Sequence, residues 1–106
     1  IRAQNEQPFR NACYSGNMEM IRQLLEWDPT IDIQAEENEA FIMACYNGYP
    51  SITRLLYELC PELILSVDIL ELFTTACKDG YTDIASQLYE WSNRTINSYV
   101  EILQHQ

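Results

Sequence analysis

The chain has 106 residues, with 16 acidic against 6 basic side chains and therefore a net charge of −10. Its hydrophobic content of 47% is typical of one globular domain, while the negative charge opposes binding to phosphate backbones and anionic lipids. No apolar run approaches the roughly 20 residues that cross a bilayer, so we expect neither nucleic acid nor membrane as a partner. The chain begins at Ile1 rather than Met, and we expect it to be part of a longer protein.

The first predicted element is a short helix that ends at Gly16. Phe9, Ala12 and Cys13 stand at the i, i+3 and i+4 spacing of one apolar helix face. Pro8 suits the first turn of this helix, because the amide proton that proline lacks has no partner there. Glycine adopts without strain the left-handed conformation that ends a helix.

A second helix is predicted to follow at once. It begins after Asn17, a residue type favoured as an N-cap, and ends before Pro29, which pushes the preceding residue out of helical geometry. Residues 30–35 then alternate apolar and polar side chains, which predicts an extended connector. The apolar face of the second helix is formed by Met20, Ile21, Leu24 and Leu25.

The same pattern returns twice along the chain at a step of 32 residues, as the positions of Gly16, Gly48 and Gly80 show. A unit of this length cannot bury its apolar face alone, so a fixed period of this size predicts stacked repeats. The other aligned sets include Phe9, Phe41 and Phe73; Met20, Ile52 and Ile84; Leu24, Leu56 and Leu88; and Pro29 with Pro61.

The later copies carry their own boundary signals. Asn38 and Asp68 are the predicted N-caps of the first helix in the second and third copies. Pro50 and Thr82 mark the start of the second helix in each. Residues 62–67 are expected to form an extended connector like that of the first copy.

After Trp91 the repeat pattern lapses. Residues 93–106 carry apolar side chains at helical spacing, which predicts an amphipathic helix that covers the last exposed face of the stack. The alternative is the start of a fourth, divergent repeat. The apolar side of this helix is formed by Ile96, Tyr99, Val100 and Leu103.

Over roughly residues 5–92 these repeats resemble the ankyrin family, whose units open their first helix with Thr-Pro-Leu-His-x-Ala. Gln7-Pro8-Phe9-Arg10-Asn11-Ala12 matches the proline, the large apolar residue and the alanine. Glu39-Ala40-Phe41 and Glu71-Leu72-Phe73 lack the Thr-Pro pair. The resemblance implies an all-α ankyrin-repeat solenoid of helix-turn-helix units with short extended connectors. The implied repeats are about 5–36, 37–68 and 69–92.

The ankyrin resemblance also implies where a partner binds. In ankyrin arrays the variable positions before each glycine generally face a concave groove, and residues Glu36, Glu37 and Glu39 of the connector are expected to border it. Tyr49 and Tyr81 match the family's histidine after the glycine, which implies a structural role. The implied groove residues are Tyr14, Ser15, Tyr46, Asn47, Lys78 and Asp79.

Three of the four cysteines, Cys13, Cys45 and Cys77, hold equivalent repeat positions. Repeats lie about 10 Å apart, beyond the reach of a disulfide, so we expect three buried free thiols and a reducing compartment, cytoplasm or nucleus. The only histidine is His105 and there is no Cys-x-x-Cys pair. We therefore predict no metal, no cofactor and no enzyme activity.

Two functional hypotheses remain. The first is a monomeric protein-protein interaction module that binds a partner protein through its concave face, with a basic partner favoured if the acidic connector takes part. The alternative is a structural spacer or scaffold that positions another domain of a longer parent protein. Arrays of this Ala-Cys-x-x-Gly type are similar to those of giant DNA viruses and of bacteria that live inside amoebae. The host-cell cytosol is then the expected location of such an effector.

Trp27 and Trp91, at the end of each second helix, are expected to pack under the connector or to serve as exposed anchors.

Overall fold

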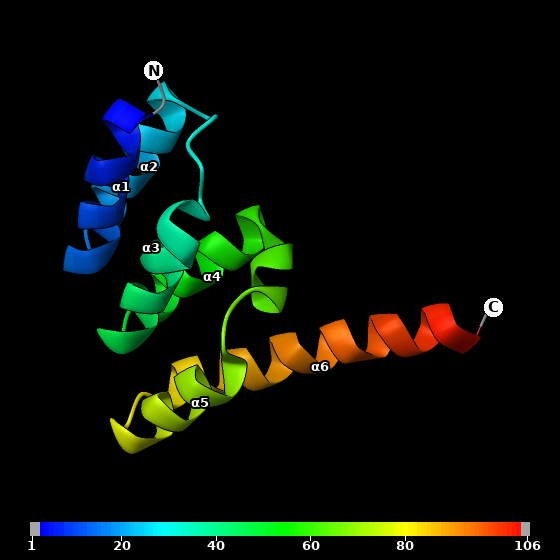
Figure 1. Ribbon diagram of the computed structural model, residues 1–106. Coiled ribbons are helices and arrows are strands. Elements are labelled where there is room, and N and C mark those ends of the chain that lie inside the picture. The colour runs from blue at the N-terminus through cyan, green and yellow to red at the C-terminus, as the bar shows by residue number, and fades with distance from the viewer. Residues whose placement is uncertain (1–2, 105–106) are drawn as a thin grey trace.

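A computed structural model describes the backbone of residues 3–104, and the side chains in that range apart from those of residues 3–6, 98 and 99. Within these residues the chain folds into six α-helices and one short 3₁₀ helix, with no strand (Figure 1). The predicted all-α class is therefore confirmed. The elements are α1 (Ala3–Ser15), α2 (Met18–Trp27), α3 (Ala35–Tyr46), α4 (Pro50–Leu59), η1 (Pro61–Leu65), α5 (Ile69–Lys78) and α6 (Thr82–Gln104).

The helices form three consecutive pairs that lie side by side in chain order (Figure 1). α1 packs against α2, α3 against α4, and α5 against α6. Neighbouring pairs meet through α1 with α3, α3 with α5, and α4 with α6. The chain thus builds one stack of helix pairs, as the 32-residue period predicts.

One apolar core runs through all three pairs. Leu24, Leu56 and Leu88, which share one repeat position, are buried in α2, α4 and α6. Phe9 and Phe41 are buried in the same way in α1 and α3. Burying a side chain of this size stabilises a fold by roughly 1.5–3 kcal/mol, so these positions carry much of the stability.

Each turn between paired helices is made by a glycine with positive φ: +77° at Gly16, +76° at Gly48 and +81° at Gly80. The predicted helix-ending glycines are confirmed. The ring of Tyr49 covers Gly16 and that of Tyr81 covers Gly48, so closely that a Cβ on either glycine would lie 2.8 or 2.7 Å from a ring atom. Both tyrosines therefore lock one pair onto the preceding turn, which agrees with the structural role expected of them.

Two of the predicted N-caps are confirmed and one is wrong. Asn17 and Asp68 each accept a hydrogen bond from the backbone N–H three residues on, at 3.0 and 3.1 Å. Asn38 is buried, and its Oδ1 has no hydrogen-bond partner. Residues 36–38 all have positive φ, +66° at Asn38. A capping side chain needs an extended backbone to reach the helix N–H groups, and this left-handed turn prevents it.

Pro8 was predicted to lie in the first turn of its helix, and this is wrong. The helix α1 begins at Ala3, and Pro8 lies inside it. A proline costs a helix the hydrogen bond to the carbonyl four residues before it. That carbonyl belongs to Gln4, in the first turn of α1, so the loss falls close to the helix end.

The connectors are not extended, contrary to prediction. In the first, Asp28 and Asp32 each accept a hydrogen bond from the backbone N–H two residues on, at 3.1 and 3.0 Å, and form two successive turns. In the second, η1 replaces the expected extended stretch over 62–67. Pro61 begins η1, and its fixed φ favours a helical start.

Residues 93–104 are helical, as predicted, but they continue α6 without a break and do not form a helix of their own. α2 and α4 end just before Pro29 and Pro61, whereas the equivalent position in α6 is Asn93. Without a proline the helix runs on and leaves the stack sideways (Figure 1). Ile96, Val100 and Leu103 are exposed and do not cover the last face. Residues 105–106, with His105, and the side chain of Tyr99 lie outside the described residues.

The cysteines are all free, and the predicted burial holds for two of the three aligned ones. Cys13 and Cys45 are buried, and burial raises the pKa of each thiol to about 12. Cys77 is exposed, contrary to prediction. The same helix face is covered by α3 in the first pair and by α5 in the second, but no further pair covers α5.

Candidate binding surfaces

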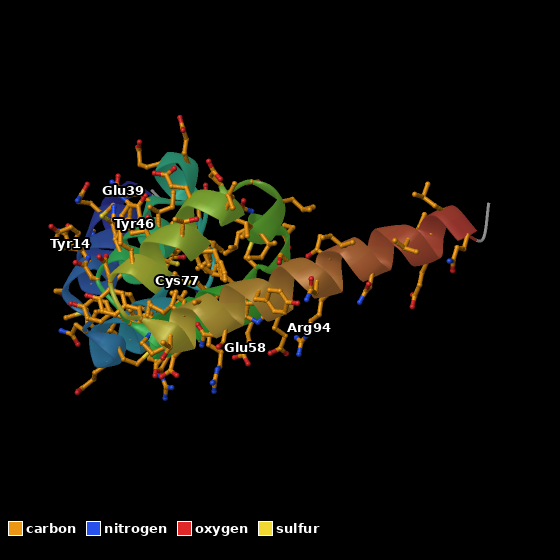
Figure 2. All side chains as sticks on the ribbon, turned by 90° about the horizontal axis from the view of Figure 1, so that it is seen from below. Tyr14, Glu39, Tyr46, Glu58, Cys77 and Arg94 are labelled. Carbon is orange, nitrogen blue, oxygen red and sulfur yellow. The ribbon has the colours of Figure 1, made fainter. Side chains whose placement is uncertain are left out.

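The C-terminal ends of α1, α3 and α5 form a surface that we call the tyrosine face. Tyr14 lies in the last turn of α1 and is 58% exposed. Tyr46 ends α3, is half-buried, and donates a hydrogen bond from its hydroxyl to Glu71 Oε1 at 3.3 Å. Burial and the negative charge of Glu71 raise the pKa of the Tyr46 hydroxyl. Figure 2 shows Tyr14 and Tyr46 on one side of the ribbon, away from Glu58 and Arg94.

The other predicted groove residues differ in whether their side chains are available to a partner. Ser15 Oγ donates to Asn11 O at 2.9 Å, and Asn47 Nδ2 donates to Met43 O at 2.9 Å, so both side chains bond to their own helix. Lys78 and Asp79, at the end of α5, are exposed. The six predicted residues therefore do lie at the ends of three adjacent helices, but Tyr14, Lys78 and Asp79 present the freest surface.

The three glutamates of the first connector are not equivalent. Glu36 and Glu37 are exposed in the left-handed turn. Glu39 lies on α3, with its Oε1 3.7 Å from Nε of Arg10 on α1. Arg10 Nε is buried and has no hydrogen-bond partner. The ion pair with Glu39 is therefore the interaction that offsets the cost of burying this part of the guanidinium group. Glu39 therefore connects the first two pairs rather than simply bordering a groove.

Polar contacts between neighbouring pairs were not predicted from the sequence. Glu71 holds the same repeat position as Glu39, and each accepts a contact from the preceding pair, from Tyr46 and Arg10 respectively. A recurring acid at this position was the available signal. A polar contact also joins the second helices of the last two pairs. The buried Thr53 Oγ1 of α4 donates a hydrogen bond to Gln87 Oε1 of α6 at 2.6 Å.

The two tryptophans have different environments. Trp91 is 5% exposed and stacks on Tyr57 of the preceding pair, with ring centroids 4.3 Å apart and an interplanar angle of 11°. Trp27, at the equivalent repeat position, is 68% exposed. Trp91 is thus a core residue, although it packs on α4 rather than under a connector, and Trp27 is available as an anchor.

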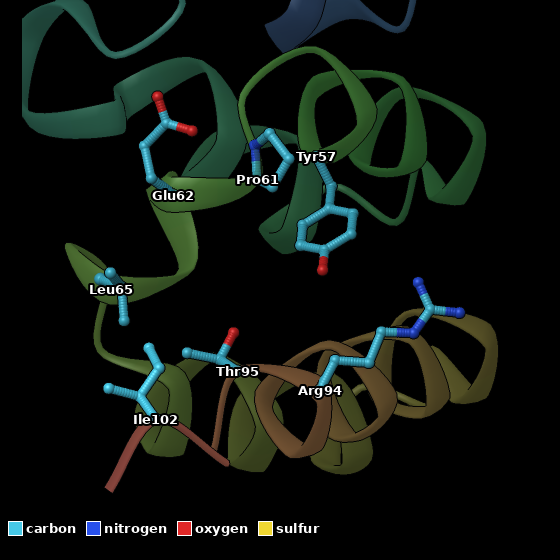
Figure 3. A pocket seen from close by; sticks show the side chains of 7 residues that line it. All are labelled: Tyr57, Pro61, Glu62, Leu65, Arg94, Thr95 and Ile102. Carbon is cyan, nitrogen blue, oxygen red and sulfur yellow. The ribbon is translucent and has the colours of Figure 1, made fainter. Parts of the chain in front are cut away.

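A second surface is a groove of about 340 Å³ between η1 and the second half of α6. Figure 3 shows side chains of α4 and η1 facing side chains of α6 across it. The groove exists because α6 continues past the point at which α2 and α4 stop. The lining residues are Tyr57, Pro61, Glu62, Leu65, Arg94, Thr95 and Ile102.

The residues that the structure describes form neither a metal cluster nor a membrane span. No group of three His, Cys, Asp or Glu side chains there is arranged to hold a metal ion. No helix in the same part of the chain is long and apolar enough to cross a membrane.

Comparison of the chain with protein-family models, with curated proteins and with solved structures gives no significant match.

Proposed function

We propose that the chain is an ankyrin-type repeat domain that binds a partner protein through the tyrosine face. Two local features support the ankyrin assignment. The helices pair around positive-φ glycines, and an aromatic ring after the glycine covers the preceding turn. The stacking of pairs in chain order agrees with them.

The observation that carries the binding proposal is Tyr14, a large aromatic side chain that is 58% exposed. Tyr46 lies at the same repeat position on the adjacent helix. Tyrosine offers a large contact area at low entropic cost and a hydroxyl that tolerates a wet interface. Two such rings on neighbouring helices are a favourable centre for a protein interface.

The proposed partner carries positive charge where it meets the first connector. Glu36 and Glu37 are exposed there, and the chain as a whole has a net charge of −10. Charges at the rim of an interface affect the association rate more than the final affinity. Reversing Glu36 and Glu37 is therefore expected to slow association and to reduce its salt dependence, while Glu39 stays unchanged so that its contact with Arg10 is preserved.

The alternative function, a structural spacer, is favoured by a different observation. Tyr46 and Glu39 each contact a neighbouring helix pair, and Ser15 and Asn47 bond to the backbone just before them. If the tyrosine face serves mainly to join neighbouring helix pairs, the domain needs no partner there.

Site-specific photo-crosslinking separates the two functions. A benzoylphenylalanine placed at Tyr14 or Tyr46, and at Glu58 on the other side as the control (Figure 2), is irradiated in a candidate host lysate. A protein captured at both tyrosine positions but not at Glu58 supports the proposal. Equal capture at all three positions, or none at the tyrosines, favours the spacer.

A captured protein is then tested in purified form. Tyr14→Ala and Tyr46→Ala together are expected to weaken its binding by about 2 kcal/mol or more. Tyr89→Ala, which removes an exposed ring of α6, is the matched control and is expected to leave binding unchanged.

A further inference from the structure

The two junctions between helix pairs use the same acid in different ways. Glu39 and Glu71 share one repeat position, as do Tyr14 and Tyr46. At the second junction the hydroxyl of Tyr46 donates to Glu71 Oε1 at 3.3 Å. At the first junction Glu39 Oε1 instead lies 3.7 Å from Nε of Arg10, and among the described residues no hydrogen bond joins Tyr14 to this acid. The acid therefore contacts a tyrosine at one junction and an arginine at the other.

The cause of this difference lies one helical turn before each tyrosine. Arg10 stands four residues before Tyr14, and residues four apart are neighbours on one helix face. Ile42 holds the equivalent position before Tyr46. Because isoleucine has no polar group, the carboxylate of Glu71 is left to the tyrosine. A guanidinium group carries a full positive charge and attracts a carboxylate more strongly than a neutral phenol does.

The guanidinium group of Arg10 is held in place by its own helix. Arg10 Nη2 donates to Gln7 Oε1 at 2.7 Å, and Gln7 Nε2 donates to Asn11 Oδ1 at 3.1 Å. The Arg10 side chain is only 13% exposed, and releasing Glu39 would leave its buried Nε without compensation. The second repeat has Glu39 and Met43 in place of the two amide side chains, so this support belongs to the first repeat.

The exposure of the two rings follows these contacts. Tyr14 is 58% exposed, whereas Tyr46 is half-buried. Each ring has the first helix of a following pair beside its own helix, α3 for α1 and α5 for α3. The difference in exposure therefore does not arise from a missing neighbour. Figure 2 shows both rings on the side of the ribbon where Glu39 lies.

We propose that Arg10 holds the carboxylate of Glu39 and thereby keeps Tyr14 free. Without the guanidinium group, the tyrosine bonds to the acid at the first junction as it does at the second. The consequence for a partner rests on the proposed function of the tyrosine face. One ring of that face is then fixed in advance, which lowers the entropic cost of binding, and the other is free to fit the partner. Arg10 is thus a specificity-determining residue that acts through Tyr14.

Acetylation of tyrosine hydroxyls by N-acetylimidazole, located by peptide mass spectrometry, tests the proposal on the whole chain without a partner. Tyr14 is expected to react faster than Tyr46. Arg10→Ile gives the first junction the residue of the second and is expected to slow Tyr14 about twofold to tenfold, the factor by which an ordinary hydrogen bond favours the bonded state. Adding Glu39→Ala removes the acceptor and is expected to restore the fast rate. Arg54→Ile, at an exposed site of α4, is the matched control and is expected to change nothing.

A second variant guards against a packing defect. Arg10→Met keeps the apolar length of the side chain and is expected to slow Tyr14 in the same way, with melting temperatures showing that each variant folds. An unchanged rate at Tyr14 in both variants overturns the proposal, and so does a slower rate that Glu39→Ala does not restore.

A purified partner of the tyrosine face separates this proposal from the proposed function. If Arg10→Ile weakens binding and slows the acetylation of Tyr14 together, both are supported. If acetylation slows while the affinity stays the same, the role of Tyr14 in binding is refuted and the role of Arg10 stands.

Discussion

The cost of adding one methyl group at a turn glycine tests how neighbouring helix pairs are held together. Gly48 and Gly80 have nearly the same backbone conformation, with φ of +76° and +81°. An alanine at either position suffers the strain of a left-handed L-residue, about 1–2 kcal/mol. The two sites differ in their surroundings. A Cβ at Gly48 lies 2.7 to 3.0 Å from ring atoms of Tyr81, whereas a Cβ at Gly80 has no neighbour within 4 Å.

Gly80→Ala is therefore expected to cost about 1–2 kcal/mol of the free energy of unfolding. Gly48→Ala carries the same strain and in addition forces the Tyr81 ring to move, and overpacking of this kind adds about 1–3 kcal/mol. Urea denaturation followed by circular dichroism measures both costs. The two variants form a matched pair, so their difference isolates the ring contact from the backbone strain.

A double-mutant cycle assigns that difference to the ring. In a Tyr81→Ala background the ring is absent, and Gly48→Ala is expected to cost no more than Gly80→Ala does in the native chain. If the two glycine substitutions cost the same in the native chain, or if removing the ring leaves the cost of Gly48→Ala unchanged, Tyr81 does not lock the second turn.

Three other predictions follow from buried side chains. Leu56→Ala is expected to lower the free energy of unfolding by about 2–5 kcal/mol, because Leu56 is 0% exposed. Leu59→Ala on the same helix, at a site 50% exposed, is the control and is expected to cost much less. Equal losses of melting temperature in the two variants would contradict the orientation of α4. Cys13 and Cys45 have pKa values raised to about 12, so their contribution is intact below about pH 9 and is lost as the pH rises towards 12, on the order of 4 kcal/mol each. Unfolding free energies measured across this range are expected to fall less steeply after both cysteines become alanine. Thr53→Val leaves an acceptor on α6 without its donor and is expected to cost about 1–3 kcal/mol in urea denaturation, whereas no loss would mean that water replaces the hydroxyl.

The features that the sequence predicted correctly depend on local chemistry. Gly16 and its equivalents end helices because only glycine takes positive φ without strain, and Pro29 ends α2 because of its own ring. The burial of Leu56 follows from helical spacing and the repeat period together. None of these predictions required the positions of particular side chains in the neighbouring pair.

The features that were missed depend on what lies next to a residue. Cys77 holds the same repeat position as Cys45, yet it is exposed because no pair covers α5. The contact between Tyr46 and Glu71 requires the spacing of α3 and α5, which no local pattern contains. The predicted site residues do lie at the ends of the helices, but which of their side chains are free could be learned only from the packing.

The long α6 helix shows how one absent residue changes the end of the stack. Asn93→Pro restores the residue that ends α2 and α4, and proline inside a helix costs about 3 kcal/mol. The second half of α6 projects from the stack (Figure 1) and has few contacts to offset that cost. The variant is therefore expected to lose the circular dichroism signal of up to about 12 residues, from 93 to 104, while the stack melts at an unchanged temperature. Asn97→Pro, one turn further on, is the control and is expected to lose less. An unchanged helical signal in Asn93→Pro would mean that contacts across the groove with η1, and not the missing proline, hold α6 straight.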